Sequence, residues 1–213
     1  MHRLKDLEAI VTDWSGVVSD DRKLAHGANS LVFRHHGIEP IPYEEWLNDM
    51  EWADPVALFA SRGLHLDAAS AYGFYEPFCD ITRKNGGKPV VYETALRFFP
   101  RLGTRHVAVV SKHPQEAIEL EAAEYGIRGY LHVIHGAVAD KADSIVAVLD
   151  AFGVSPRKAA YIGDMPQDVA ASKKAGTLSI AVKYGYLERR LDKLQASNPD
   201  ILVDSLDELI PHL

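Results

Sequence analysis

The sequence predicts an α/β fold in which helices cover both faces of a parallel sheet and a helical segment is inserted after the first strand. Two observations lead to this prediction. Short apolar runs rich in β-branched residues alternate with helix-length segments, and one long interval breaks the alternation. The chain of 213 residues is long enough for a main domain that carries a smaller one.

Six buried strands are expected from the apolar runs, because each run is short and is bounded by polar or turn-forming residues. Continuous apolar runs are typical of strands that are buried on both faces, as in a parallel sheet. The expected strands are Leu7–Thr12, His106–Val110, Leu131–Ile134, Ala159–Ile162, Leu178–Val182 and Ile201–Val203.

Helices are expected between these strands. The segment 115–125 has Pro114 at its start and Gly126 at its end, which is the usual placement of proline and glycine around a helix. The segments 141–152 and 167–174 are similar, and a glycine follows each of them within two residues. Strand and helix therefore alternate through this part of the chain.

A helical insertion is expected at residues 18–88, between core segments 1–17 and 89–213. This interval contains no convincing buried strand, is rich in aromatic side chains and ends in the flexible sequence Asn85-Gly86-Gly87. Its amphipathic stretches lie near residues 24–35, 43–50, 54–62 and 67–80.

The composition excludes several classes of protein. There are 23 Lys and Arg against 30 Asp and Glu, for a net charge of −7, and no block of basic residues, which argues against a nucleic-acid partner. No apolar run approaches the roughly 18 to 20 residues that cross a bilayer, so no membrane partner is expected. The single cysteine, Cys79, cannot form an intramolecular disulfide. We therefore expect a cytoplasmic protein; its oligomeric state is not readable from the sequence.

Polar residues follow the expected strands at the edge where open parallel sheets bind ligands. Asp13 and Ser111 end the first two strands, Lys141 opens the helix after the third, and Asp164 and Asp168 follow the fourth. Each residue alone could be a helix cap or a solvated charge. Together, the carboxylates, the hydroxyl and the ammonium suit phosphoryl transfer with Mg²⁺ as the metal.

These residues lie in motifs that resemble those of the haloacid dehalogenase-like (HAD) hydrolase superfamily. The motifs are Asp13-Trp14-Ser15-Gly16-Val17, Ser111, Lys141 and Gly163-Asp164-Met165-Pro166-Gln167-Asp168. The likeness covers nearly the whole chain, and the segment 180–186 is similar to phosphoglycolate phosphatase-like members. The resemblance implies a Rossmann-like core and a helical cap domain formed by the insertion.

The resemblance also implies a role for each matching residue. Asp13 would attack phosphorus to form an aspartyl-phosphate, while Ser111 and Lys141 would bind the transferring group. Further phosphate-binding candidates are Ser15, Gly16 and Lys112. The expected ligands of Mg²⁺ are Asp13, Asp164, Asp168 and the backbone carbonyl of Ser15.

Ser15 departs from the pattern of the family, because its phosphatases usually carry aspartate two residues after the nucleophile. That aspartate protonates the leaving group, and a serine hydroxyl cannot supply such an acid near neutral pH. A histidine is a plausible replacement, and His26 and His113 are the candidates.

Other activities stay open as alternatives. A phosphonoacetaldehyde hydrolase has a small residue at the place of Ser15 but needs a cap lysine, and no lysine lies between Lys23 and Lys84. A dehalogenase would need a tyrosine at position 15. A sugar-phosphate mutase would need the missing acid/base residue twice in each catalytic cycle. A binding or regulatory protein with a weakened site would also tolerate Ser15. We favour a Mg²⁺-dependent phosphatase acting on a small phosphorylated metabolite.

Overall fold

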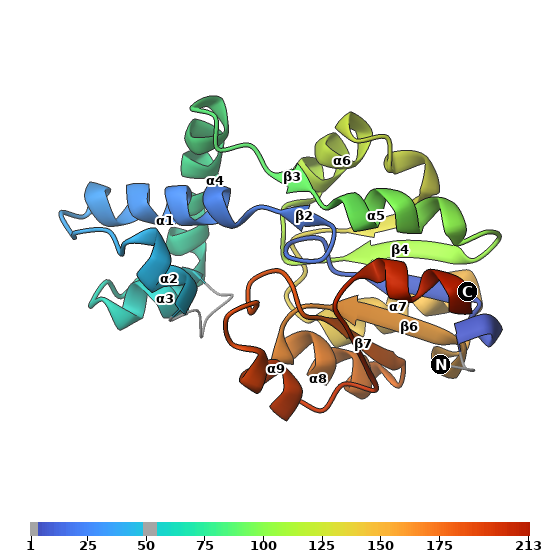
Figure 1. Cartoon of the computed structure of the whole chain (residues 1–213). Coiled ribbons are helices and arrows are strands. Elements are labelled where there is room, and N and C mark those ends of the chain that lie inside the picture. The colour runs from blue at the N-terminus through green and yellow to red at the C-terminus, as the bar shows by residue number, and fades with distance from the viewer. Residues whose placement is uncertain (1–3, 49–54) are drawn as a thin grey trace. The chain divides into compact units, whose positions relative to one another are not determined.

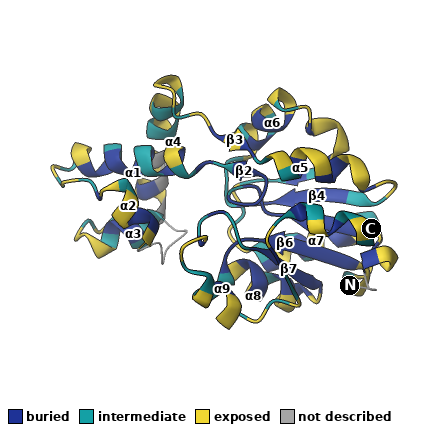
Figure 2. Ribbon diagram, viewed as in Figure 1, coloured by how far each residue is buried: buried dark blue, intermediate teal, exposed yellow. Residues whose placement is uncertain are grey.

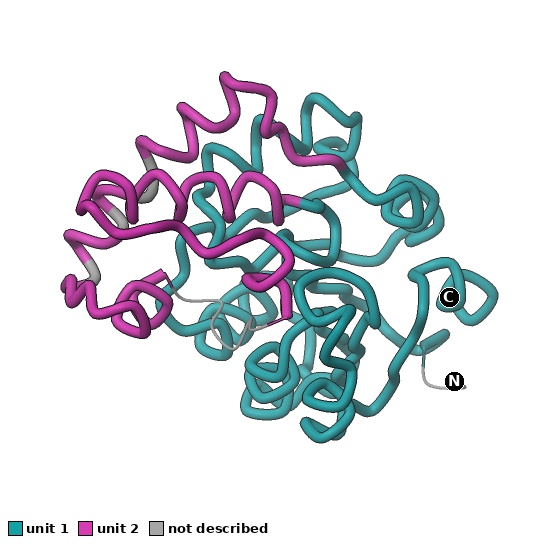
Figure 3. The backbone as a smooth tube through the Cα atoms, turned by 60° about the vertical axis from the view of Figure 1, so that its left-hand side comes forward, with its two compact units in different colours: residues 1–20, 91–213 teal, residues 21–90 magenta. Residues whose placement is uncertain are grey.

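The structure, a computed structural model, describes residues 4–48 and 55–213, without the side chains of residues 68, 72, 75 and 76 (Figure 1). Trp52 and the end of the stretch expected near 43–50 lie outside the described residues. The chain divides into two compact units (Figure 3). Unit 1 comprises Met1–Asp20 and Val91–Leu213, and unit 2 comprises Asp21–Val90.

The centre of unit 1 is a six-stranded parallel sheet with strand order β5-β4-β1-β6-β7-β8. All six strands expected from the sequence are present, so the predicted α/β fold with a parallel sheet is confirmed. The strands are β1 (Ala9–Thr12), β4 (His106–Val110), β5 (Val133–His135), β6 (Ala159–Gly163), β7 (Leu178–Val182) and β8 (Ile201–Val203).

The register of the sheet brings the ends of its central strands together. Thr12, the last residue of β1, is paired with Val109 of β4 and with Ile162 of β6. The residues that follow these three strands therefore leave the sheet at one edge, which is where open parallel sheets bind ligands.

The helices α6, α7 and α8 of unit 1 begin and end close to the predicted positions, whereas α5 and α9 were not predicted. Gly153 and Gly176, with φ values of 67° and 78°, end the helices α7 and α8 in the left-handed conformation that favours glycine. The α-helices are α5 (Glu93–Phe98), α6 (Gln115–Glu124), α7 (Lys141–Phe152), α8 (Pro166–Ala175) and α9 (Leu191–Ala196). Short 3₁₀ helices are Leu4–Asp6, Phe99–Arg101, Arg128–Tyr130, Pro156–Lys158, Leu206–Glu208 and Ile210–His212.

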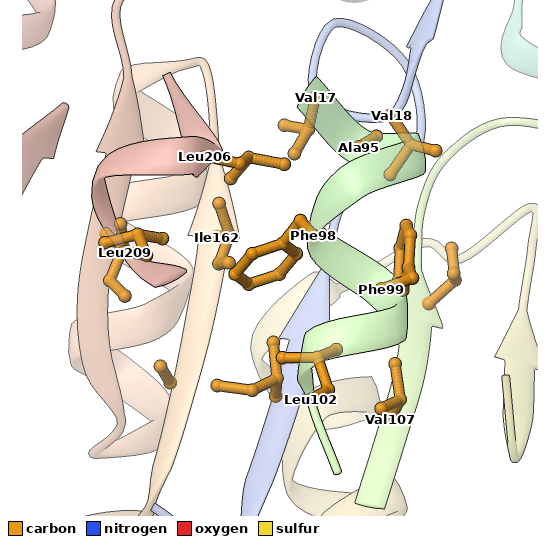
Figure 4. Packing of buried hydrophobic residues seen from close by; sticks show 14 of the residues in the cluster. Val17, Val18, Ala95, Phe98, Phe99, Leu102, Val107, Ile162, Leu206 and Leu209 are labelled. Carbon is orange, nitrogen blue, oxygen red and sulfur yellow. The ribbon is translucent and has the colours of Figure 1, made fainter. Parts of the chain in front are cut away.

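Hydrophobic side chains pack on both faces of the sheet, and Figure 2 shows its central strands coloured as buried. Ile10 of β1 packs in one cluster with Phe98 of α5 and Ile118 of α6, and Figure 4 shows Phe98 beside Ile162 of β6. Val11, the next residue of β1, packs in the opposite cluster with Leu149 of α7. Alternate residues of one strand thus pack into two cores, which explains why β1 is buried throughout.

The described part of unit 2 is helical, which confirms the predicted helical insertion. Its α1 packs against α4, and at Gly27 of α1 an added Cβ would lie 2.5 Å from Cγ2 of Thr82, so the two helices approach closely at this glycine. Phe33 and Phe59 pack edge to face with ring centroids 5.4 Å apart. The helices are α1 (Arg22–His35), α2 (Tyr43–Asn48), α3 (Pro55–Ser61) and α4 (Ala68–Lys84).

Two short strands were not expected from the sequence. β2 (Ser19–Asp20) and β3 (Val90–Val91) pair as a separate two-stranded sheet. Two residues are too few to show the alternation on which a strand prediction depends. No helix among the described residues has the length and apolar character needed to cross a bilayer.

Candidate active site

Three aspartates converge where the central strands end. Asp13 directly follows β1, Asp164 follows β6, and Asp168 lies in the first turn of α8. All three are buried, and one carboxylate oxygen from each lies within 4.8 Å of the others. The structure therefore brings together the three carboxylates that the sequence places after separate strands.

The loop after β1 fixes Asp13. The backbone amide of Asp13 donates to the carbonyl of Ile162 at 2.8 Å, which extends the pairing of β1 with β6 by one residue. The Oδ1 atom of Asp13 accepts a hydrogen bond of 2.7 Å from the amide of Trp14. The carbonyl of Trp14 accepts from the amides of Val18 and Ser19, both at 2.9 Å, and this closes the loop into a tight turn.

Gly16 brings this loop against Asp164. Its φ of +77° is in the left-handed region, and an added Cβ would lie 2.2 Å from Oδ2 of Asp164. Gly185 approaches the same oxygen, because its Cβ would lie 2.5 Å away. The Oδ2 atom also accepts a 2.7 Å hydrogen bond from the amide of Tyr186. Backbone from two loops therefore holds one side of the Asp164 carboxylate.

The second carboxylate oxygen of Asp164 lacks such contacts. Its Oδ1 atom is buried and has no hydrogen-bond partner among the described residues. A buried charged oxygen without a partner is costly, and such an atom calls for an explanation such as a bound ion.

Asp168 is both a helix cap and a partner of Lys141. Its Oδ2 atom accepts from the amide of Met165 at 3.0 Å, as a capping residue does. Its Oδ1 atom accepts from Nζ of Lys141 at 2.6 Å. The capping interpretation of Asp168 is therefore correct, and it does not exclude a place in the site.

Lys141 joins two of the carboxylates. Its Nζ atom lies 2.5 Å from Oδ2 of Asp13 and 2.6 Å from Oδ1 of Asp168, and its side chain is 9% exposed. Burial opposes the charge of Lys141, but the carboxylates of Asp13 and Asp168 outweigh burial and raise the pKa of this lysine above its ordinary value. Lys141 is therefore an ammonium near neutral pH.

The charges of the site fit a divalent cation. Three carboxylates and one ammonium leave an excess of two negative charges in a buried place. Burial, followed by the charges of Asp168 and Asp13, raises the pKa of Asp164 well above its usual range. Burial likewise raises the pKa of Asp168, although Lys141 opposes this shift. Carboxylate oxygens are the ligands that Mg²⁺ prefers, so the donor set, including Oδ1 of Asp164, can hold this ion.

Comparison with known proteins agrees with this architecture. The profile of a family described as haloacid dehalogenase-like hydrolase matches residues 92–182. A phosphoglycolate phosphatase from Chromobacterium violaceum is 27% identical over 97% of this chain and 96% of its own length. A haloacid dehalogenase-like family hydrolase from Streptococcus pneumoniae has the same fold, with a TM-score of 0.82 at 19% identity over 98% of this chain and 99% of that one. CbbY from Rhodobacter sphaeroides, solved in complex with phosphate, gives a TM-score of 0.77 at 20% identity over 95% and 96% of the two chains.

Residues 92–182 of this chain are thus similar to the haloacid dehalogenase-like hydrolases. The resemblance seen in the sequence motifs is thereby confirmed, and the homologues of this enzyme include a phosphatase. The matched segment 92–182 contains Ser111, Lys141, Asp164 and Asp168 but not Asp13. The strand pairing described above brings Asp13 to the same edge of the sheet.

Ser111 directly follows β4 and so lies at the same edge of the sheet as the aspartates. It is 1% exposed, and its amide donates to the carbonyl of His135 at 3.0 Å. Its Oγ atom accepts a 3.2 Å hydrogen bond from the amide of His113. Lys112, the next residue, is half-buried, and among the described residues no ion pair joins it to Asp13.

The two candidate histidines have different surroundings. Nδ1 of His113 lies 3.3 Å from Oγ of Ser15, within unit 1. His26 belongs to unit 2, where its Nε2 atom lies 2.8 Å from the carbonyl of Ile41 and its ring packs against that of Tyr43.

Two buried residues near the site were missed from the sequence. The hydroxyl of Tyr161 donates to the carbonyl of Val110 at 3.0 Å and lies 3.5 Å from Oδ1 of Asp168. Glu121 of α6 is 5% exposed and accepts hydrogen bonds from Nε1 of Trp14 at 2.8 Å and from Oγ of Ser19 at 3.0 Å. A signal for Glu121 exists in the sequence, because it lies three residues after Ile118 on the apolar stripe of its helix.

Proposed function

We propose that this HAD hydrolase is a Mg²⁺-dependent phosphatase that acts on a small phosphorylated metabolite through an aspartyl-phosphate at Asp13. The observation that carries the proposal is the buried contact of Lys141 with Asp13 and Asp168, beside the unpartnered oxygen of Asp164. Phosphoryl transfer depends mostly on positioning and charge neutralisation, and this arrangement supplies both.

Asp13 is the proposed nucleophile. An oxygen of its carboxylate attacks phosphorus, the bond from phosphorus to the ester oxygen breaks, and the bonding pair leaves with that oxygen, which takes up a proton. The amide of Trp14 and the ammonium of Lys141 hold the two oxygens of Asp13 before attack. The ammonium also reduces the repulsion between the carboxylate and the phosphoryl oxygens, and this effect is stronger in a buried site than in water.

The three aspartates are the proposed metal ligands. Asp164 has an oxygen to offer, and Asp13 and Asp168 lie within reach of the same point. Mg²⁺, when bound, would neutralise charge on the phosphoryl oxygens. The backbone carbonyl of Ser15 stays a predicted fourth ligand.

The phosphoryl group is proposed to lie among Ser111, Lys141 and the loop after β1, with Lys112 as a further candidate. The hydroxyl of Ser111 can donate to a phosphoryl oxygen while it accepts from His113. The amide of Gly16 already donates to the carbonyl of Ser19 at 2.8 Å. We therefore assign to Gly16 the close approach to Asp164 rather than a hydrogen bond to phosphate.

The second half of the reaction is hydrolysis. Water attacks the phosphorus of the aspartyl-phosphate, the bond to Asp13 breaks, and inorganic phosphate and the free carboxylate form. The insertion expected at 18–88, which overlaps unit 2 over residues 21–88, is the proposed cap that excludes bulk water and selects the substrate. The full-length relative makes phosphoglycolate the first metabolite to test.

A metal-dependent substrate screen tests the proposal. Purified protein is assayed with Mg²⁺ or with chelator against phosphate monoesters, including phosphoglycolate, and against phosphonoacetaldehyde, with Asp13→Asn as the negative control. Phosphate release from monoesters that needs both Mg²⁺ and Asp13 is the expected result. Activity on phosphonoacetaldehyde alone would favour cleavage of a carbon–phosphorus bond, and no turnover of any compound would favour a binding or regulatory protein.

A further inference from the structure

A chain of three polar side chains begins at Ser15, the position where phosphatases of this family usually carry a carboxyl group. Oγ of Ser15 lies 3.3 Å from Nδ1 of His113, and Nε2 of His113 lies 3.5 Å from Oε1 of Glu121. The side chains of His113 and Glu121 are 10% and 6% exposed. A hydroxyl, an imidazole and a carboxylate are thus aligned in a largely buried place, two residues from Asp13.

Glu121 is held where it can orient the ring of His113. Its other oxygen, Oε2, accepts from Nε1 of Trp14 and from Oγ of Ser19, so the carboxylate cannot turn freely. An ionised carboxylate only accepts hydrogen bonds, and Oε1 therefore favours a proton on the facing Nε2 atom of His113. The opposite nitrogen, Nδ1, is then the atom that exchanges a proton with Ser15.

The charge of Glu121 fits this arrangement. Burial alone raises the pKa of a carboxyl group, but here the contacts with His113, Trp14 and Ser19 outweigh burial and lower the pKa of Glu121. Glu121 is therefore ionised near neutral pH and can stabilise a positive charge on the ring.

We propose that Ser15, His113 and Glu121 form a relay that does the work of the missing carboxyl group, with the Ser15 hydroxyl at the substrate and with His113 and Glu121 as positioning residues behind it. This inference rests on the proposed phosphatase function and deepens it.

The proton balance of the relay closes over the two half-reactions. The cycle begins with His113 as the imidazolium, which carries a proton on Nε2 and another on Nδ1. When Asp13 displaces the ester oxygen, that oxygen takes the proton of the Ser15 hydroxyl, Oγ of Ser15 takes the proton of Nδ1, and the ring becomes neutral. When water attacks the aspartyl-phosphate, the water proton passes to Oγ, whose own proton returns to Nδ1. The ester and water become an alcohol and phosphate, and no other reactant is consumed.

The proposed relay predicts which substrates are hydrolysed more slowly when His113 or Glu121 is replaced. An alkyl leaving group needs a proton, whereas the p-nitrophenolate ion leaves without one. Loss of the relay should therefore lower kcat/KM for ethyl phosphate much more than for p-nitrophenyl phosphate. A merely structural role of His113 or Glu121 would lower both alike.

Three variants separate these roles. His113→Asn keeps a polar atom near Ser15 but cannot carry the proton, and it should lower kcat/KM for ethyl phosphate by about 10²-fold, the low end of acid–base effects. Glu121→Gln can still accept from Trp14 and Ser19 through its amide oxygen, yet it turns an NH₂ group toward His113. It should lower the same value by about tenfold, because the charge of Glu121, 3.5 Å from Nε2, no longer stabilises a positive charge on the ring. Ser19→Ala is the matched control, because it removes another contact of Glu121 and leaves the His113 contact in place.

The experiment measures kcat/KM for both esters in the wild type and the three variants, with thermal unfolding as the check on folding. A ratio of ethyl to p-nitrophenyl activity that falls in His113→Asn and Glu121→Gln but not in Ser19→Ala supports the relay. An unchanged ratio in folded His113→Asn overturns it, as does a wild type that hydrolyses only the aryl ester. A wild type that hydrolyses neither ester refutes the phosphatase function itself.

Discussion

We expect Asp164→Asn to be more stable than the wild type in chelator and less stable than the wild type in saturating Mg²⁺. The substitution keeps an oxygen that can accept from the amide of Tyr186 and removes one charge from the carboxylate group. It also replaces the buried Oδ1 atom, which has no partner among the described residues. Without metal, the variant should therefore be the more stable protein.

The size of the effect follows from the contacts. Burial and the neighbouring carboxylates disfavour a charge on Asp164, and Asp164→Asn removes that charge, so the variant should have the higher free energy of unfolding in chelator. The raised pKa of Asp164 has the same physical origin, since burial and the charges of Asp168 and Asp13 disfavour its ionised form. Mg²⁺ at about 100 times its Kd should stabilise the wild type by about 2.7 kcal/mol, and the variant by much less.

Urea unfolding at pH 7, in chelator and in saturating Mg²⁺, measures both differences. Asp150→Asn is the matched control, because Asp150 is an exposed carboxylate on α7 and lies outside the metal-binding group. It should leave the stabilisation by Mg²⁺ unchanged. Equal stabilisation of the wild type and Asp164→Asn by Mg²⁺, or a loss of stability in Asp164→Asn in chelator, would refute the metal site.

Three further outcomes are expected. Ser15→Asp introduced into His113→Asn should raise kcat/KM for ethyl phosphate by about 10²-fold, because a carboxyl group at position 15 no longer needs the ring; no recovery would argue against the equivalence of the relay and the carboxyl group. Gly16→Ala should abolish stabilisation by Mg²⁺, since its Cβ would lie 2.2 Å from Oδ2 of Asp164 and φ is +77°; calorimetric titration with Mg²⁺ checks this, and wild-type affinity would contradict it. The pKa of Glu121 in the folded protein lies below its ordinary value of 4.5. The ionised carboxylate therefore stabilises the fold above pH 4.5, and this stabilisation is lost as the pH falls through the folded pKa. The difference in unfolding free energy between the wild type and Glu121→Gln should therefore shrink below about pH 4.5, and a difference that grows on acidification would contradict this.

The architecture was predictable because local patterns specify it. Buried strands such as β1 are apolar on both faces, and Gly153 and Gly176 mark the ends of α7 and α8. The pair of β2 and β3 was not predictable, because it depends on two residues in each of two segments that lie far apart in the sequence. Long-range pairing of such short segments leaves no periodic signal.

The convergence of Asp13, Asp164 and Asp168 was also foreseeable, because residues after parallel strands share one edge of the sheet. The arrangement behind Ser15 was not. The contact between His113 and Glu121 depends on the packing of α6, which one sequence does not give, and a glutamate in a helix is usually exposed. The order of the strands in the sheet likewise follows from tertiary packing.

The most direct test of the central claim is the detection of a phosphoryl group on Asp13. The protein is mixed with Mg²⁺ and ³²P-labelled phosphate ester, quenched in acid during turnover and digested, and the labelled peptide is sequenced by mass spectrometry. The account predicts a hydroxylamine-sensitive label on Asp13 and none in Asp13→Asn. Turnover without label on Asp13, or a label on another residue such as His113, would contradict it.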